Sequence, residues 1–99
     1  MTSAIKLAEG VELDFARIAK HLAAHKVPDL PERIESIRLA IDVLAQSPQI
    51  GRPVRRGLRE LVIGKAERGY LALYRYQPIE DVVLILAVRH QRERGYRKN

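Results

Sequence analysis

The feature that most constrains this chain is a pair of apolar runs separated by a short polar turn. The first run covers residues 69–76 and contains three tyrosines, and the second is apolar from Val82 to Val88. Aromatic and β-branched residues on both sides of a turn that contains a proline predict a β-hairpin. Because the second run shows no polar alternation, we expect it to form a central strand that is covered on both faces.

The second run ends in a basic segment, where the sequence concentrates its candidate chemical groups: Arg89, His90, Arg92, Arg94 and Tyr96. One interpretation is a metal-free phosphodiester-cleaving site. Imidazole or phenol would then move protons, while guanidinium groups stabilise the charge that builds up on the phosphate. The other interpretation is a strand end that only docks an anionic partner, and the residue types alone favour this second one.

The charge of the chain is unevenly distributed. A length of 99 residues predicts one domain, residues 1–99, with a net charge of +6. Residues 1–49 hold six Lys/Arg against seven Asp/Glu, and residues 50–99 hold twelve against five, so the second half carries a balance of +7. Because this half also contains the predicted hairpin, we expect a face built for polyanions; the alternative is a solvated basic surface.

Several classes of protein are disfavoured by composition. The chain has no cysteine, which excludes disulfides and thiol nucleophiles and fits a reducing cytoplasm. No apolar run approaches the roughly 18 residues that span a bilayer, and the first residues lack the apolar stretch of a secretory signal. His21 and His25 have the i, i+4 spacing of a metal-binding pair but suggest no third ligand. We therefore predict a cytoplasmic protein with no membrane segment, no metal site and no cofactor.

Helical periodicity dominates the first half of the chain. From about Glu9, apolar residues recur on one face of a predicted helix that ends before Pro28: Val11, Phe15, Ile18 and Leu22. A second helix is predicted to begin at residues 29–33 and to continue through Ile34, Ile37, Ile41 and Leu44. Leu39 and Val43 broaden its apolar surface, so we expect the second helix to be the more buried. The short connection predicts an αα-hairpin.

The remaining patterns predict strands. Residues 5–8 alternate like a short first strand, residues 49–57 resemble a loop, and residues 58–63 precede the hairpin as a further strand. The predicted order is β-α-α-β-β-β: an α+β domain with an N-terminal strand, an αα-hairpin and a three-stranded antiparallel sheet. Tyr70, Tyr74 and Tyr76 share one face of their strand and Arg75 the other. We interpret the tyrosines as sheet packing and not as a base-stacking platform; which face the helices cover stays open.

Four strings in series resemble the ParE/RelE family of bacterial toxins from type II toxin–antitoxin modules. They are Ala45-Gln-Ser-Pro-Gln-Ile-Gly-Arg-Pro, Leu58-Arg-Glu-Leu-Val-Ile-Gly, Tyr70-Leu-Ala-Leu-Tyr-Arg-Tyr and Ile85-Leu-Ala-Val-Arg-His-Gln-Arg-Glu. The resemblance runs over nearly the whole chain. It implies a small cytoplasmic growth inhibitor of the plasmid-stabilising kind, held in a hetero-oligomer by a cognate acidic antitoxin. Folding of a partly disordered acidic segment onto a basic surface is consistent with the charge balance.

Two activities are found in that family. RelE-like members cut mRNA on the ribosome without a metal, whereas ParE-like members poison DNA gyrase. Leu71 stands where RelE-like relatives often have an arginine, which favours the ParE side and gyrase as the target. The predicted target- or nucleic-acid-binding residues are Lys65, Arg68, Arg75, Arg89 and Arg94. If the chain is instead an endoribonuclease, the predicted catalytic residues are His90, Arg92 and Tyr96. A third alternative is a basic binding module, or a degenerate toxin kept only for its complex with the antitoxin.

Overall fold

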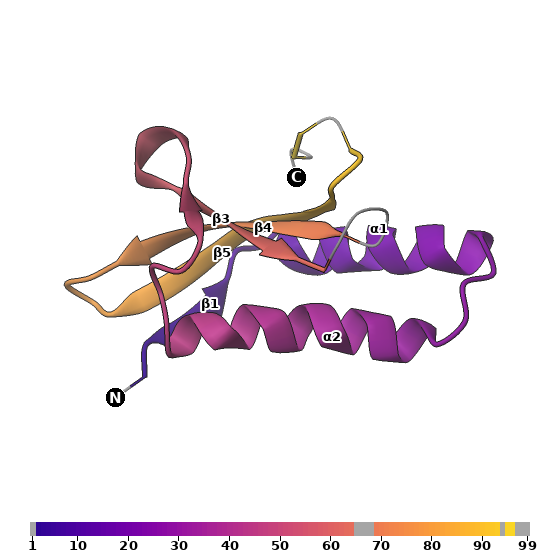
Figure 1. The fold of residues 1–99 in the computed structure, drawn as a ribbon, viewed down its shortest axis with the longest axis horizontal. Coiled ribbons are helices and arrows are strands. Elements are labelled where there is room, and N and C mark those ends of the chain that lie inside the picture. Colours follow the sequence, from indigo (N-terminus) through magenta and orange to yellow (C-terminus); the bar gives the residue numbers. More distant parts are fainter. Residues whose placement is uncertain (1, 65–68, 94, 97–99) are drawn as a thin grey trace.

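The computed structural model describes residues 2–64, 69–93 and 95–96. The elements in chain order are β1 (Ala4–Leu7), α1 (Val11–Ala24), α2 (Leu30–Asp42), the 3-10 turn η1 (Val43–Ala45), β2 (Arg52–Pro53), the 3-10 turn η2 (Arg55–Gly57), β3 (Arg59–Ile63), β4 (Tyr70–Gln77) and β5 (Val82–His90). The helical hairpin covers one face of the sheet, and the C-terminal segment lies on the opposite side (Figure 1). The predicted α+β class is therefore confirmed.

The sheet has five strands in the order β1-β5-β4-β3-β2, which is two more than the antiparallel sheet we predicted. The predicted three strands form its centre. β1 pairs with β5 in parallel, with Ala4 opposite Val82, so β5 is flanked on both sides as its apolar sequence indicates. β2 arises within the expected loop and pairs with β3. Its Pro53 is tolerated because β2 is an edge strand, where one missing N–H donor breaks no interior ladder.

The tyrosine stripe faces the helices. Tyr70, Tyr74 and Tyr76 pack with the apolar face of α1 in a single core, and the Tyr74 side chain is completely buried. The Tyr74 hydroxyl accepts a hydrogen bond of 2.8 Å from the backbone N–H of Gly51, which satisfies that buried group. The interpretation of this stripe as packing is confirmed. The open face of the sheet therefore carries Arg75.

The second helix is less buried than the first, contrary to our expectation. In α2 only Ile37 and Ile41 are buried, whereas α1 buries five residues. Leu39 and Val43 are 57% and 47% exposed. The physical reason is the layering: α1 packs against both β5 and α2, so α2 is left with a broad outer surface in solvent.

A β-bulge in β5 decides which way the end of this strand faces. Leu73 pairs with Ala87 but Tyr74 pairs with Ile85, so Leu86 is an extra residue without a partner in β4. An extra residue reverses the alternation of side chains. Beyond the bulge His90 therefore lies on the helix side, opposite Tyr70, and Arg89 lies on the open face of the sheet.

Candidate functional site

The end of β5 presents the predicted catalytic residues on two different faces of the sheet. The His90 ring meets the Tyr70 ring edge-to-face with centroids 5.2 Å apart, on the helix side. On the open face, the Arg89 guanidinium lies 4.8 Å from the centre of the Tyr96 ring. His90 and Tyr96 are close in the sequence, but their side chains lie on opposite faces of the sheet.

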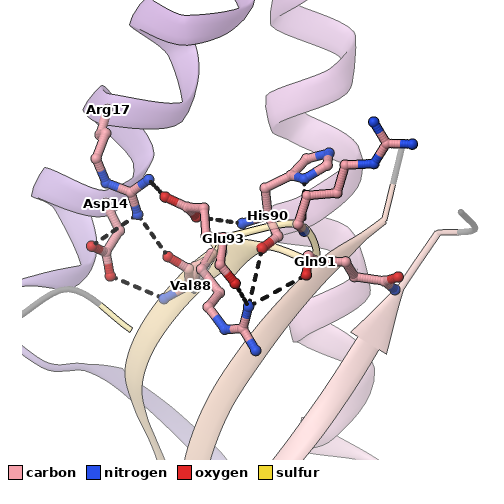
Figure 2. Close-up of polar contacts among 8 residues, drawn as sticks. Asp14, Arg17, Val88, His90, Gln91 and Glu93 are labelled. Atoms are coloured by element: carbon pink, nitrogen blue, oxygen red, sulfur yellow. Dashed lines mark hydrogen bonds and ion pairs between the residues drawn. The ribbon is translucent and has the colours of Figure 1, made fainter. Parts of the chain in front are cut away.

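On the helix side, a network of polar contacts fixes the turn after β5 to α1 (Figure 2). Arg17 bonds to the carboxylate of Glu93 and donates to the Val88 carbonyl at 3.3 Å. The other Glu93 carboxylate oxygen accepts the backbone N–H of His90 at 2.7 Å. Asp14 lies 3.6 Å from Arg17 and accepts the backbone N–H of Val88 at 2.9 Å. The position of His90 is thus determined by α1 as well as by its own strand.

His90 and Arg92 are brought together by this turn. The Nδ1 atom of His90 accepts the backbone N–H of Arg92 at 3.1 Å. Since Nδ1 acts as an acceptor, the neutral ring carries its proton on Nε2. Two members of the predicted catalytic set therefore share one side of the sheet, with a defined imidazole tautomer.

Both residues line a groove of about 680 Å³, which we call the helix-side groove. Its rim contains all three histidines of the chain together with arginines from α1, α2 and the C-terminal turn: Arg17, His21, His25, Arg33, His90 and Arg92. Its floor is apolar and includes Ile18, Leu22 and Tyr70. Within residues 2–64, 69–93 and 95–96, no three His, Cys, Asp or Glu side chains converge in a way that would hold a metal ion.

On the open face, Glu60 of β3 forms a second cluster. Glu60 as a whole residue is 7% exposed, and its carboxylate accepts hydrogen bonds from the Tyr96 hydroxyl at 2.6 Å and from Arg52 at 3.0 and 2.5 Å. Burial raises the pKa of Glu60, but the bonds from Tyr96 and Arg52 and the charges of Arg52 and Arg89 outweigh it and lower this pKa below its ordinary value. Burial, followed by the bond to Glu60, raises the pKa of Tyr96. The phenol therefore holds its proton.

The Arg89 guanidinium binds mainly to backbone carbonyls of the turn that follows β5. Its Nη1 atom donates to the Glu93 carbonyl at 2.5 Å and, more weakly, to the carbonyls of His90 and Gln91 at 3.4 and 3.5 Å. Its Nε atom is buried without a hydrogen-bond partner among the described residues. Arg89 thus closes the turn and supports the Tyr96 ring more than it offers a charge to solvent.

The remaining predicted residues are dispersed. Arg75 is exposed on the open face of β4, while Lys65, Arg68 and Arg94 lie outside the described residues. Sequence reasoning missed Glu60, Arg52 and Arg17 as members of the two clusters. A signal for Glu60 was present, since it is one of five carboxylates in the strongly basic half and occupies a strand. Arg17 gave no such signal, because its partners are distant in sequence.

The fold and the basic strand end define a small two-layer α+β protein. Residues 5–95 match the family described as the ParE toxin of type II toxin–antitoxin system, parDE. The chain belongs to this ParE/RelE family of type II toxins, as the resemblance of its four strings indicated. No helix among residues 2–64, 69–93 and 95–96 is long and apolar enough to cross a membrane.

Individual relatives agree with the family assignment. Toxin RelE3 of Caulobacter vibrioides is 30% identical over 91 residues, which cover 91% of this chain and 96% of that protein. The chromosomal ParDE toxin–antitoxin system from P. aeruginosa contains a chain with a TM-score of 0.75 and 20% identity, covering 89% of this chain and 95% of that one. The toxin–antitoxin complex RelBE2 from Mycobacterium tuberculosis gives a TM-score of 0.60 and 23% identity, covering 92% and 100%. These two structures show the shared fold.

Proposed function

We propose that this toxin inhibits growth by binding and poisoning DNA gyrase, without chemistry of its own. The observation that supports this is the separation of the predicted catalytic groups by the sheet. General acid–base catalysis requires its groups within hydrogen-bond reach of one reacting centre. His90 and Arg92 lie on the helix side, whereas Tyr96 lies on the open face and donates a hydrogen bond to Glu60.

The distribution of cations is consistent with a binding role. Arg75 is exposed on the open face of the sheet. The segment from β2 to β3 adds four arginines: Arg52, Arg55, Arg56 and Arg59. A surface of one sign attracts polyanions and raises the rate at which they associate. Gyrase engaged with DNA presents such a polyanion.

The direct test is a supercoiling reaction with purified toxin, gyrase, relaxed plasmid and ATP. We expect loss of supercoiled product and, after addition of detergent, linear DNA from trapped cleavage complexes. Arg75→Gln should weaken both effects, while His90→Gln, which changes a residue on the opposite side of the sheet, should leave them intact. Normal supercoiling with no trapped complex at saturating toxin would refute the proposal.

One observation favours a second candidate, a ribosome-dependent and metal-independent endoribonuclease. His90 has a defined tautomer and shares the helix-side groove with Arg17, Arg33 and Arg92. A single imidazole surrounded by guanidinium groups is able to move a proton and stabilise a phosphorane-like charge. Primer extension on mRNA from induced cells would then show cuts at codon positions, and His90→Gln would abolish both the cuts and the toxicity.

We also propose a cognate antitoxin with an acidic segment, and a cytoplasmic hetero-oligomer of the two proteins. The similar structures from P. aeruginosa and M. tuberculosis are toxin–antitoxin systems. The balance of +7 in residues 50–99 supports an acidic partner for this chain as well. Copurification of the protein encoded beside this one is the first experiment.

A further inference from the structure

The helix-side groove has the size of a small-molecule site. It lies between the last turns of α1, the beginning of α2, the first residue of β4 and the last residue of β5. Its volume is about 680 Å³. Ligand sites usually measure about 300–1,000 Å³ and combine an apolar lining with a few polar groups. Ile18, Leu22 and Tyr70 supply the apolar part, and each is less than 10% exposed.

The rim of the groove is cationic. Arginines reach it from three parts of the chain, and Glu93, the carboxylate among its described lining residues, is bound by Arg17 and by the backbone N–H of His90. Arg33 is half-buried, and its guanidinium makes no hydrogen bond or ion pair with another residue of the described part of the chain. A partly desolvated cation without a counter-charge is stabilised by an anionic ligand.

Aromatic rings accompany these charges. The imidazoles of His21 and His25 lie 4.3 Å apart at an angle of 39°, and the His90 ring contacts Tyr70. Flat side chains next to guanidinium groups suit a ligand that joins an aromatic ring to a phosphate. The ring stacks on the aromatic surface or covers the apolar floor, and the phosphate takes paired hydrogen bonds from arginine.

We infer that the helix-side groove binds a nucleoside monophosphate, either free or as the 5′-phosphorylated end of a single strand. An acidic peptide is the less suitable occupant, because the apolar floor and the neighbouring imidazoles of His21 and His25 suit a flat ring as well as a charge. The inference does not depend on gyrase as the target. It concerns the face of the sheet opposite Arg75.

The test is calorimetric titration of the full chain with AMP at low salt, alongside inorganic phosphate and adenosine. We expect AMP to bind more tightly than either fragment, because only AMP uses both the floor and the rim. Arg33→Gln should weaken AMP binding about tenfold, as expected for the loss of one charge-assisted contact. Arg55→Gln is the matched control, since it removes the same charge from the exposed η2 turn outside the groove, and it should change the affinity by less than about twofold.

The two sources of the ligand are separated by oligonucleotides. A single strand with a 5′-phosphate that binds as tightly as AMP, while its unphosphorylated form does not, identifies a strand end; much weaker binding identifies the free nucleotide. Failure of AMP to bind at millimolar concentration would overturn the inference. So would phosphate binding as tightly as AMP, an equal loss in Arg55→Gln, or a glutamate-rich peptide binding through Arg33 where AMP does not. None of these results bears on the supercoiling assay, which tests the proposed function separately.

Discussion

The carboxylate of Asp14 in α1 accepts a hydrogen bond from the backbone N–H of Val88 in β5 at 2.9 Å. The pairing of β1 with β5 ends with Leu7 opposite Ile85, so Val88 has no strand on that side. Arg17, one turn further along α1, donates a hydrogen bond to the carbonyl of Val88. The two side chains of a helix therefore complete the sheet edge that β1 leaves open, and they hold the end of β5 in place.

Asp14→Ala should destabilise the protein markedly. Asp14 is 1% exposed, and its removal leaves the buried N–H of Val88 without an acceptor and Arg17 without one of its two carboxylates. We expect a loss of about 2–3 kcal/mol in the free energy of unfolding, measured by urea denaturation. Glu35→Ala, an exposed position on α2, is the control and should change it by less than about 0.5 kcal/mol. Equal effects of the two substitutions would contradict the role of Asp14.

Gly51→Ala should also destabilise the fold. A Cβ atom at this position would lie 2.6 Å from both the Cε1 and the hydroxyl oxygen of the buried Tyr74 ring, which has no room to move. We expect a loss of about 2–3 kcal/mol from overpacking. Gly69→Ala makes a suitable comparison, because a Cβ there meets the flexible side chain of Gln91, which is able to swing away. Thermal unfolding of the two variants should show the larger decrease for Gly51→Ala.

Glu60 makes part of the stability dependent on pH. Because its pKa is lower in the folded protein than in the unfolded chain, its contribution is present above the ordinary value near 4.5 and is lost as the pH falls through the lowered pKa. Glu60→Gln should therefore cost roughly 1–3 kcal/mol at pH 7 and less near pH 3. Denaturation of both proteins at the two pH values checks this. A cost that is the same at both values would show that the charge of Glu60 is not involved.

All four tyrosines should ionise at a higher pH in the folded protein than in the unfolded chain. Burial is the main cause that raises the pKa of Tyr70, Tyr74 and Tyr96, and the hydrogen bond to Asp81 is the main cause for Tyr76. The folded protein thus holds these protons above pH 10 while the unfolded chain releases them, so stability decreases as the pH rises through this range. Absorbance at 295 nm should show phenolate appearing together with alkaline unfolding. Early ionisation of one tyrosine in the folded protein would be contrary to this expectation.

Association with the antitoxin should weaken with salt. The charge of residues 50–99 is strongly positive, and interactions between exposed charges are screened within about 8 Å at physiological ionic strength. We expect the dissociation constant of the complex to rise about tenfold or more between 50 and 500 mM NaCl, mostly through slower association. Surface plasmon resonance at several salt concentrations provides the measurement. An affinity independent of salt would show that electrostatic attraction does not contribute to antitoxin binding.

Local patterns in the sequence determined much of this protein. The spacing of Phe15, Ile18 and Leu22 defined the buried face of α1, and the apolar run from Val82 to Val88 identified β5 as a central strand. The stripe of tyrosines was recognisable as packing from its alternation alone. Each of these properties depends on residues a few positions apart, so the spacing of apolar residues along the sequence is enough to predict it.

Tertiary structure alone decided how the candidate site is divided. The bulge at Leu86 decides that His90 faces the helices and Arg89 the open face, and not the reverse. No pattern in the strand shows where an extra residue interrupts the pairing. The bonds from Arg17 to Glu93 and from Tyr96 to Glu60 join residues 76 and 36 positions apart. Such contacts depend on how the layers pack and which strand edges remain open. The sequence thus determined which groups gather at the end of β5, and the packing of α1 against the sheet decided which of them meet.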